Sequence, residues 1–224
     1  LLYAYGGFNI SMKPYFNKAL SILYENDGVY ALANLRGGSE YGQDWHEAGM
    51  LHNKQNVFDD FISAGEFLID SGYTSTEKLA IGGGSNGGLL VSACMLQRPD
   101  LFSLVDCSVP VTDMLRFHKF TIGWAWVPEF GSSENKDQFE TLIQYSPVHN
   151  VRYGTKYPSM IISTADHDDR VVPLHSYKLA AELQAKQGAD NPILLQVYGK
   201  SGHGAGKPTS QVIREIAEKW AFIL

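Results

Sequence analysis

The stretch "KLAIGGGSNGGLLVSA", from Lys78 to Ala93, places a single serine between two groups of glycines and two apolar runs. The run before the glycines has the length of a strand, and the run after them has the pattern of a helix. Gly83, Ser85 and Gly87 fit the motif G-x-S-x-G, in which a sharp strand-to-helix turn exposes a serine hydroxyl above a sheet. The stretch therefore predicts a nucleophilic Ser85.

A glycine-rich phosphate or dinucleotide loop is the alternative interpretation of this stretch. Its glycines lack the G-x-G-x-x-G spacing, and it has no lysine in the position that a P-loop needs. In the nucleophile interpretation, the amide of Asn86 lies at the N-terminus of the following helix, where a free N–H can bind a developing oxyanion. Motif and context together favour the nucleophile.

Strand-length apolar runs alternate with amphipathic helices along the chain. Strands are predicted over residues 1–5, 29–35, 78–83, 103–109, 159–164 and 193–198, and helices over 56–72, 88–97, 173–188 and 211–224. This alternation predicts an α/β fold with a mostly parallel sheet and helices on both faces. Functional sites in such sheets gather at the C-terminal ends of the strands.

The helices 56–72, 173–188 and 211–224 have apolar stripes, which predict the side that faces the core. The stripe of helix 56–72, which is expected to end at the C-cap residue Gly72, consists of Val57, Phe58, Phe61, Ile62, Phe67, Leu68 and Ile69. The stripe of the closing helix consists of Val212, Ile213, Ile216, Trp220 and Ile223. The aromatic-rich region from about Thr112 to Pro158 is predicted to be an irregular insertion within one domain, residues 1–224.

Composition excludes several classes of function. The 224 residues carry a net charge of −6 without a basic run, so nucleic acid is not expected as a partner. No apolar stretch is long enough to cross a membrane. Cys94 and Cys107 lie in apolar patterns typical of buried thiols, which suits a reducing compartment and predicts a cytoplasmic location. The chain starts in mid-strand without Met, so we expect it to be part of a longer protein.

A serine nucleophile of this fold needs a base and an acid later in the chain. His203 follows the last predicted strand and is flanked by glycines, which makes it the favoured base. The other six histidines are interpreted as surface or core-edge residues: His46, His52, His118, His149, His167 and His175. Asp166, Asp168 and Asp169 all follow strand 159–164, and spacing does not choose among them as the acid.

Seven stretches resemble the catalytic domain of the prolyl oligopeptidase family: "YAYGGFNIS", "RGGSEYGQDWHEAGML", "KQNVFDDF", "GGSNGGLL", "QRPDLF", "TADHDDRVVPLHS" and "GHGAGKP". The resemblance runs essentially from end to end. It implies an α/β-hydrolase fold and a serine peptidase that cleaves short peptides on the carboxyl side of proline, without metal or organic cofactor. It also implies a β-propeller domain elsewhere in a longer chain, together with a short N-terminal segment.

The resemblance assigns roles by position. It makes Ser85 the nucleophile, Asp168 the acid and His203 the base. Tyr5 corresponds to the tyrosine whose hydroxyl joins the Asn86 amide in the oxyanion hole, although its residue pattern alone indicates only a packed strand tyrosine. Further along, the resemblance makes Arg170 the ligand of a substrate carbonyl, a role suited to a fixed multidentate cation. A salt bridge to Asp168 or Asp169 is the other interpretation of Arg170, and it is compatible with the substrate role.

The resemblance also implies a proline pocket built by Trp126, Phe8, Val111, Phe130, Val171 and the Asn86 side chain. A flat indole can stack on a pyrrolidine ring, and an apolar pocket has no charge to attract a basic side chain. The pattern "IGWAWVPEFG" alone is equally consistent with ordinary core. Phe130 stands where the family commonly has tyrosine, and proline preference is expected to survive that difference.

Three other functions compete with this prediction. A related enzyme such as oligopeptidase B requires acidic groups in its pocket, which the aromatic Trp126 and Phe130 do not supply. A lipase or carboxylesterase would share the serine turn and the order of the triad. A catalytically dead binding module would lack one triad residue, and all three are present in this sequence.

Overall fold

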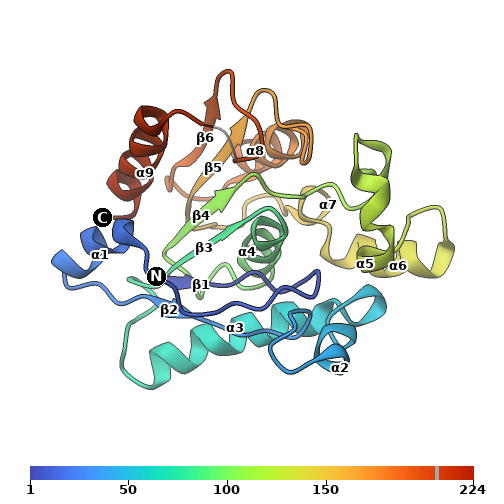
Figure 1. Cartoon of the computed structure of the whole chain (residues 1–224), viewed down its shortest axis with the longest axis horizontal. Helices are drawn as coiled ribbons and strands as arrows, with labels where there is room; N and C mark the ends of the chain where they lie inside the picture. The colour runs from blue at the N-terminus through green and yellow to red at the C-terminus, as the bar shows by residue number, and fades with distance from the viewer. Residues whose placement is uncertain (205–206) are drawn as a thin grey trace.

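A six-stranded parallel sheet forms the centre of the computed structural model, which describes residues 1–204 and 207–224 (Figure 1). The strands follow the spatial order β2-β1-β3-β4-β5-β6, with all neighbours parallel. Their bounds are β1 Leu2–Tyr3, β2 Ala31–Leu32, β3 Ala80–Gly84, β4 Leu104–Ser108, β5 Ser159–Ala165 and β6 Ile193–Tyr198. All six predicted strands are confirmed, although β1 and β2 are shorter than predicted. Residues 205 and 206 of the quoted stretch 202–208 lie outside the described residues.

Helices cover both faces of the sheet, as the alternating pattern predicts (Figure 1). One face carries α1 (Ser21–Glu25) and α9 (Thr209–Ile223), which share a small apolar cluster with the 3-10 helix η1 (Lys18–Leu20). The opposite face carries α3 (Gln55–Asp70), α4 (Asn86–Gln97) and α8 (Leu174–Lys186). The short helices α2 (Gln43–Glu47) and η2 (Leu51–Asn53) precede α3. The chain therefore has the α/β-hydrolase architecture of a parallel sheet between two helical layers.

The main core lies between the sheet and the layer of α3, α4 and α8. It includes Phe58 and Phe61 from α3, Val105 from β4, Ile162 from β5 and Leu179 from α8, all fully buried. The central strands are buried on both sides, which explains why their sequences are continuous apolar runs and not alternating patterns. Gly72 ends α3 with a left-handed φ of +76°, which confirms its predicted role as a cap.

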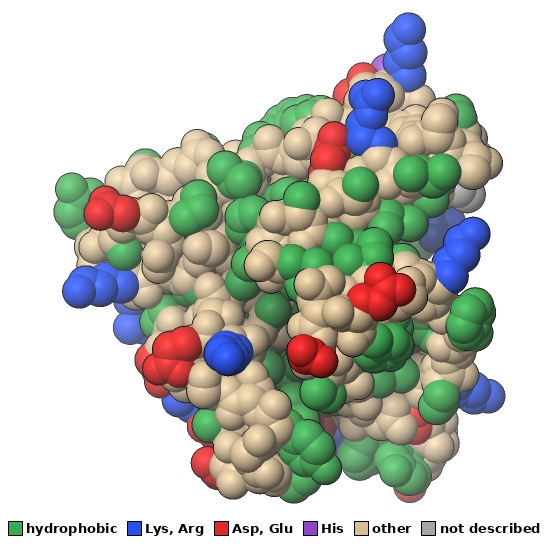
Figure 2. Space-filling view, turned by 90° about the vertical axis from the view of Figure 1, so that its left-hand side faces the viewer, with side chains coloured by type: hydrophobic (Ala, Val, Ile, Leu, Met, Phe, Trp, Pro, Cys, Tyr) green, Lys and Arg blue, Asp and Glu red, His purple; other side chains and the backbone are tan. Residues whose placement is uncertain are grey.

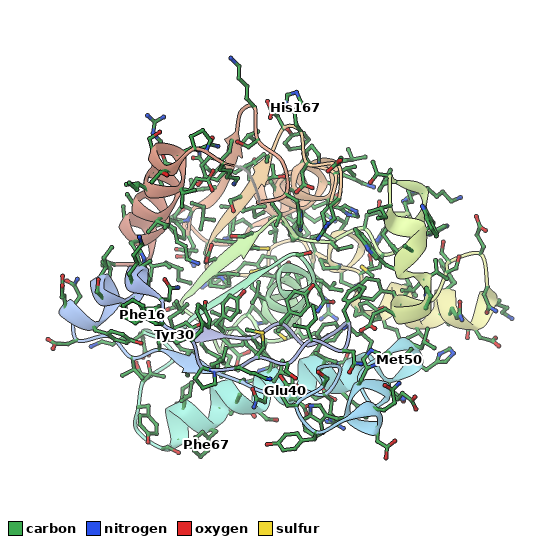
Figure 3. The ribbon with its side chains drawn as sticks, viewed as in Figure 1. Phe16, Tyr30, Glu40, Met50, Phe67 and His167 are labelled. Carbon is green, nitrogen blue, oxygen red and sulfur yellow. The ribbon has the colours of Figure 1, made fainter. Side chains whose placement is uncertain are left out.

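Three residues of the predicted apolar stripes face solvent. Phe67 is 62% exposed and projects from α3 (Figure 3) because it lies six residues after Phe61, and about 100° per residue places it off the buried side. Near the start of α9, Val212 is 38% exposed and Ile213 is 62% exposed. Trp220 supplies the buried contact of this helix, with Ile216 and Ile223 partly buried around it.

The region 112–158 is more regular than predicted. It contains η3 (Phe117–Lys119), η4 (Gly123–Trp126), α5 (Val127–Phe130), α6 (Lys136–Tyr145) and α7 (Pro147–Asn150). The side chain of Asn135 caps α6 by accepting hydrogen bonds from the amides of Asp137 and Gln138. This cap was a readable signal that the prediction of an irregular insertion overlooked. The helices lie on one side of the sheet, beside its C-terminal edge (Figure 1).

Hydrophobic side chains are exposed on the side of the molecule that carries α1 and α9 (Figure 2). Phe16 is 92% exposed, and Tyr15, Tyr24 and Val29 are each about half exposed. A cavity of about 740 Å³ lies near this region, lined by residues that include Leu1, Leu23, Val29, Tyr73 and Leu224. In the described part of the chain, no helix is both long and apolar enough to cross a membrane.

Candidate active site

Ser85 occupies a strained turn between β3 and α4. Its φ of +58° and ψ of −116° lie outside the regions that non-glycine residues prefer, and the residue caps the N-terminus of α4. The tight turn needs small neighbours: a Cβ on Gly83 would lie 2.2 Å from the Gly87 carbonyl oxygen. A Cβ on Gly88 would lie 2.7 Å from Pro110. The sequence folds into a turn of the predicted kind, with the Ser85 side chain half-buried.

His203 and Asp168 meet at the C-terminal edge of the sheet. The Nδ1 atom of His203 lies 2.7 Å from Oδ2 of Asp168, whose side chain is fully buried. The other oxygen of Asp168 accepts hydrogen bonds from the amides of Arg170 and Val171, at 3.0 and 2.8 Å. These bonds fix the carboxylate and leave one oxygen to orient the imidazole. Nε2 of the same ring is thereby free of the carboxylate.

The other candidate acids lie in different environments. Asp166 is exposed and pairs with His167, with 2.6 Å between Oδ1 and Nδ1. The hydrogen bond from His167 is the largest cause that lowers the pKa of Asp166, to about 2. Asp169 is exposed. Asp168 is thus the one of the three aspartates that the structure brings to His203 and also buries.

The remaining histidines have other partners. The residues they contact are Glu129 for His46, Thr141 for His52, Glu134 for His118, Ser146 for His149, Asp166 for His167, and the amides of Thr112 and Asp113 for His175. Among the described residues, Ser85 makes no hydrogen bond to the His203 ring. Contacts between a nucleophile and its base often tighten only when substrate binds.

Tyr5 follows β1 and lies beside the serine turn. Burial raises the pKa of the Tyr5 phenol, and the neighbouring Ser85 side chain offsets part of that rise. The phenol therefore stays protonated at neutral pH and can donate a hydrogen bond. Asn86 opens α4, and its amide is one of the first N–H groups of a helix, which have no acceptor within the helix. Two donors thus lie next to Ser85.

The aromatic residues predicted for the pocket form one cluster with Phe117. Phe8 and Phe130 meet edge to face with 5.3 Å between ring centroids, and Phe117 contacts Phe130 at the same distance. Trp126 stacks on Phe117, at 6.3 Å and 14° between planes, and stays half-buried. Sequence reasoning missed Phe117, whose only signal was its place in the aromatic insertion.

The two predicted pocket valines form backbone hydrogen bonds with Ser85 and Asp168. The Val111 amide donates to the Ser85 carbonyl at 3.4 Å, and the Val171 amide donates to Asp168. Both valine side chains are buried. Arg170 is exposed, and the ion pairs of the described residues do not include it. The other interpretation of Arg170, as a salt bridge to a neighbouring aspartate, therefore has no support in the described structure.

A buried polar network behind the serine turn was missed by sequence reasoning. Lys54 is 1% exposed, and its ammonium donates to the Gly6 carbonyl at 2.9 Å and to Oδ1 of Asn86 at 3.4 Å. Glu129 is 5% exposed; it accepts from the Phe8 amide and contacts Nε2 of His46, each at 2.8 Å. Lys54 lies in a stretch that resembles the family, but no motif or spacing marked it as functional.

Within residues 1–204 and 207–224, no group of three or more histidine, cysteine or acidic side chains is arranged to hold a metal ion. The architecture and the strained serine turn define the α/β-hydrolase class. The family model described as "Prolyl oligopeptidase family" matches residues 14–224. The chain therefore belongs to the prolyl oligopeptidase family.

Similar proteins cover the whole chain. A prolyl endopeptidase of Elizabethkingia miricola is 54% identical over 225 aligned residues, which include 100% of this chain and 32% of the relative. A prolyl endopeptidase of Dictyostelium discoideum is 53% identical over 97% of this chain and 29% of its own length. The solved structure of oligopeptidase B from Leishmania major superposes with a TM-score of 0.96 at 33% identity, over 99% of this chain and 31% of that one. The chain spans about a third of the length of the curated relatives it matches.

Proposed function

We propose that this chain is the catalytic domain of a serine peptidase that cleaves short peptides on the carboxyl side of proline. The observation that carries the proposal is the 2.7 Å contact between His203 and the buried Asp168, in a chain that also holds Ser85 on a strained strand-to-helix turn. The relatives named prolyl endopeptidase support the substrate class. In this proposal Ser85 is the nucleophile, His203 the base and Asp168 the acid.

The proposed reaction is acyl transfer in two steps. His203 takes the proton from the Ser85 hydroxyl, whose oxygen bonds to the carbonyl carbon of proline. The C–N bond then breaks, and the leaving amine takes that proton from His203. Water repeats the sequence against the acyl-enzyme and releases the peptide acid. Asp168 stabilises the imidazolium in each step, and the chemistry uses only side chains and water.

Tyr5 and Asn86 are proposed to bind the oxyanion that forms in each step. One donor is the phenol of Tyr5, which is held protonated, and the other is the Asn86 amide at the N-terminus of α4. Both groups lie beside Ser85 before substrate arrives, so little reorganisation accompanies the reaction. Arg170, which is exposed next to the acid, is proposed to bind the substrate carbonyl before the proline.

Proline selectivity is assigned to the aromatic cluster of Phe8, Trp126 and Phe130, with Val111, Val171 and the Asn86 side chain around it. The half-buried Trp126 leaves part of its indole accessible for stacking on a pyrrolidine ring. Specificity for a basic side chain, as in oligopeptidase B, would need a free carboxylate in this pocket. Glu129 is close to Phe130, but both of its oxygens are engaged, by the Phe8 amide and by His46.

The chain is further proposed to be part of a longer protein with a β-propeller domain, because its relatives are about three times as long. The apolar side chains exposed around α1 support contact between this side of the chain and another part of the longer protein (Figure 2). We also propose a cytoplasmic location, which suits the two buried and unpaired cysteines, Cys94 and Cys107. Short peptides are the proposed substrates, and neither nucleic acid nor membrane is a proposed partner.

The proposed function is tested on the full-length protein that carries this chain. Four chromogenic peptide amides that differ only in having Pro, Ala, Arg or Phe before the scissile bond are compared by kcat/KM. We expect Pro to exceed the other three, and a fluorophosphonate to label Ser85 covalently. Preference for Arg would indicate the oligopeptidase B specificity instead. Hydrolysis of simple esters with no peptide cleavage would indicate a carboxylesterase.

A further inference from the structure

The segment from Tyr5 to Phe8 connects two parts of the proposed active site. Tyr5 supplies a proposed oxyanion donor, and Phe8 contributes to the proposed proline pocket. Between them, Gly6 has a left-handed φ of +64°, and Phe8 itself has a φ of +57°. A non-glycine residue in that conformation is strained and needs its surroundings to hold it. The surroundings of this segment therefore bear on catalysis.

Three buried side chains hold this segment by its peptide groups. The side-chain amide of Asn86 donates through Nδ2 to the Tyr5 carbonyl at 2.6 Å. Lys54 donates to the Gly6 carbonyl at 2.9 Å, and Glu129 accepts from the Phe8 backbone amide at 2.8 Å. The three side chains come from separate places in the chain: the start of α4, the residue before α3, and α5. Each peptide group is buried or half-buried, so losing its partner would leave polar atoms unsatisfied.

Lys54 is the member of this group that links both halves of the proposed oxyanion hole. Its ammonium contacts the Gly6 carbonyl next to Tyr5, and also Oδ1 of Asn86, whose backbone amide is the second proposed donor. The same nitrogen lies 5.4 Å from the centroid of the Phe130 ring, within the range of a cation–π interaction. The ammonium therefore contacts two residues of the proposed site, Asn86 and Phe130, and the peptide group next to a third, Tyr5.

The charge on Lys54 makes these contacts stronger than neutral hydrogen bonds would be. Burial lowers the pKa of Lys54 to about 8, and the nearby Glu129 carboxylate opposes that shift. The ammonium form therefore prevails at neutral pH. A fully buried lysine is costly unless its charge is compensated, and here the Glu129 carboxylate, the Gly6 carbonyl and Oδ1 of Asn86 compensate it.

We propose that Lys54 is a positioning residue that holds Tyr5 and Asn86 in register to bind the oxyanion. It does not touch substrate; it acts through the Gly6 carbonyl and the Asn86 side chain. This inference rests on the proposed function of the site. It predicts a defect in the chemical step, where the oxyanion forms, with little effect on the binding of the ground-state peptide.

The test uses Lys54→Met in the full-length protein, which keeps an unbranched apolar stem as far as the ε position and removes the ammonium with its charge and donors. Lys219→Met is the matched control, because Lys219 in α9 pairs with the buried carboxylate of Asp106 in β4, and neither residue belongs to the proposed site. We measure kcat and KM on a proline peptide amide, and normalise kcat to the fraction of Ser85 that a fluorophosphonate titrates. Supporting residues of a reactive site typically contribute about 10- to 100-fold, so we expect a loss of that size in kcat.

The expected KM of Lys54→Met is within about threefold of the parent value, and Lys219→Met should keep its kcat within about threefold. A double-mutant cycle with Tyr5→Phe separates positioning from general packing. If Lys54 acts by placing the Tyr5 hydroxyl, Lys54→Met should cost much less in the Tyr5→Phe background than in the parent, because the group it positions is already gone.

Three results would overturn the inference alone: an unchanged kcat in Lys54→Met, an equal loss in Lys219→Met, or full additivity with Tyr5→Phe. These three results count against the inference alone when the parent protein cleaves the proline peptide and is labelled at Ser85. A parent protein that shows neither cleavage nor labelling would instead overturn the proposed function, and this inference with it.

Discussion

Asp166 and Asp168, which both follow β5, differ in how far they are buried. Asp168 is 3% exposed and accepts hydrogen bonds from two backbone amides, besides its contact with His203. Asp166 is exposed and pairs with His167. A buried carboxylate that is already held in place can orient and stabilise an imidazolium without reorganising. An exposed carboxylate beside a surface histidine is screened by water and contributes little.

The first prediction contrasts these two aspartates. Asp168→Asn should reduce kcat by about 10³- to 10⁴-fold, because the amide cannot stabilise the charged ring and favours the wrong tautomer. Asp166→Asn is the matched control and should reduce kcat by less than about tenfold. Steady-state kinetics with a proline peptide amide provides the measurement. A greater loss in Asp166→Asn than in Asp168→Asn would move the acid to the other carboxylate.

Residues of the candidate site were predictable from sequence to different degrees. Ser85 was predictable because a serine turn is encoded by residues next to each other in the chain. The choice of Asp168 over its neighbours depends on burial, which spacing does not encode, and it needed the resemblance. Lys54 and Glu129 were not predictable, because each contacts a distant peptide group that only the folded chain brings near.

At the scale of elements, the turn between β3 and α4 depends on how closely strand and helix approach. A Cβ on Gly83 would lie 2.2 Å from the backbone oxygen of Gly87, and backbone cannot move aside as a side chain can. Gly84, the next residue, has room: its Cβ would meet the Ser108 carbonyl oxygen at an ordinary 3.5 Å. The close approach of strand and helix therefore requires glycine at position 83 but leaves room for a Cβ at position 84.

The second prediction follows from this difference. Gly83→Ala should lower the free energy of unfolding by at least about 2 kcal/mol through overpacking, and Gly84→Ala should lower it by less than about 1 kcal/mol. Chemical denaturation of both variants, with soluble yield as a second readout, provides the comparison. Equal stability of the two variants would show that the turn relaxes and that close packing at Gly83 is not required.

The first turn of α8 connects that helix to the loop after β4 through a buried histidine. Nδ1 of His175 accepts from the amides of Thr112 and Asp113, at 3.2 and 3.0 Å, so it must carry no proton. Desolvation is the largest cause that lowers the pKa of His175, from 6.5 to about 4. The loop it holds includes Val111 of the proposed pocket.

The third prediction is acid sensitivity from His175. Its pKa is lower in the folded state than in the unfolded one, so between about pH 6.5 and pH 4 the unfolded chain binds more protons. Stability is then lost as pH falls through that window, by up to about 3 kcal/mol. His175→Asn keeps an acceptor near Nδ1 but does not titrate, so its unfolding midpoint in urea should change less between pH 7 and pH 4.5. Parallel changes in both proteins would contradict this account.

At the scale of the whole molecule, the parallel sheet and the helices of 112–158 carry different parts of the proposed function. Ser85, Asp168 and His203, the proposed nucleophile, acid and base, all follow strands at the C-terminal edge of the sheet. The alternating strands and helices of the sequence were enough to predict this common location. The pocket aromatics belong mostly to 112–158, where the sequence predicted an irregular insertion and the structure forms five short helices. Which aromatics face substrate and which face the core was therefore not predictable from their pattern.

The last prediction concerns selectivity, and it follows because the proposed triad and the pocket aromatics lie on different parts of the fold. A triad treats all acyl groups alike, whereas a pocket discriminates by fit, so proline preference should depend on the aromatic cluster and not on Ser85, Asp168 or His203. Trp126→Ala should lower kcat/KM for a Pro substrate more than for the matching Ala substrate, by a differential of about 1 to 3 kcal/mol.

Trp124→Ala is the matched control, because Trp124 belongs to the same 3-10 helix but is 68% exposed. It removes the same side chain from the same element, so it should leave the ratio of Pro to Ala rates unchanged. Arg170→Ala should weaken both substrates alike, since the carbonyl that Arg170 is proposed to bind is present in each. Trp126 stacks on Phe117, and loss of packing alone would lower both rates in proportion to the folded fraction. An equal loss on Pro and Ala substrates in folded Trp126→Ala would therefore make Trp126 a core residue and move the pocket to Phe8 and Phe130.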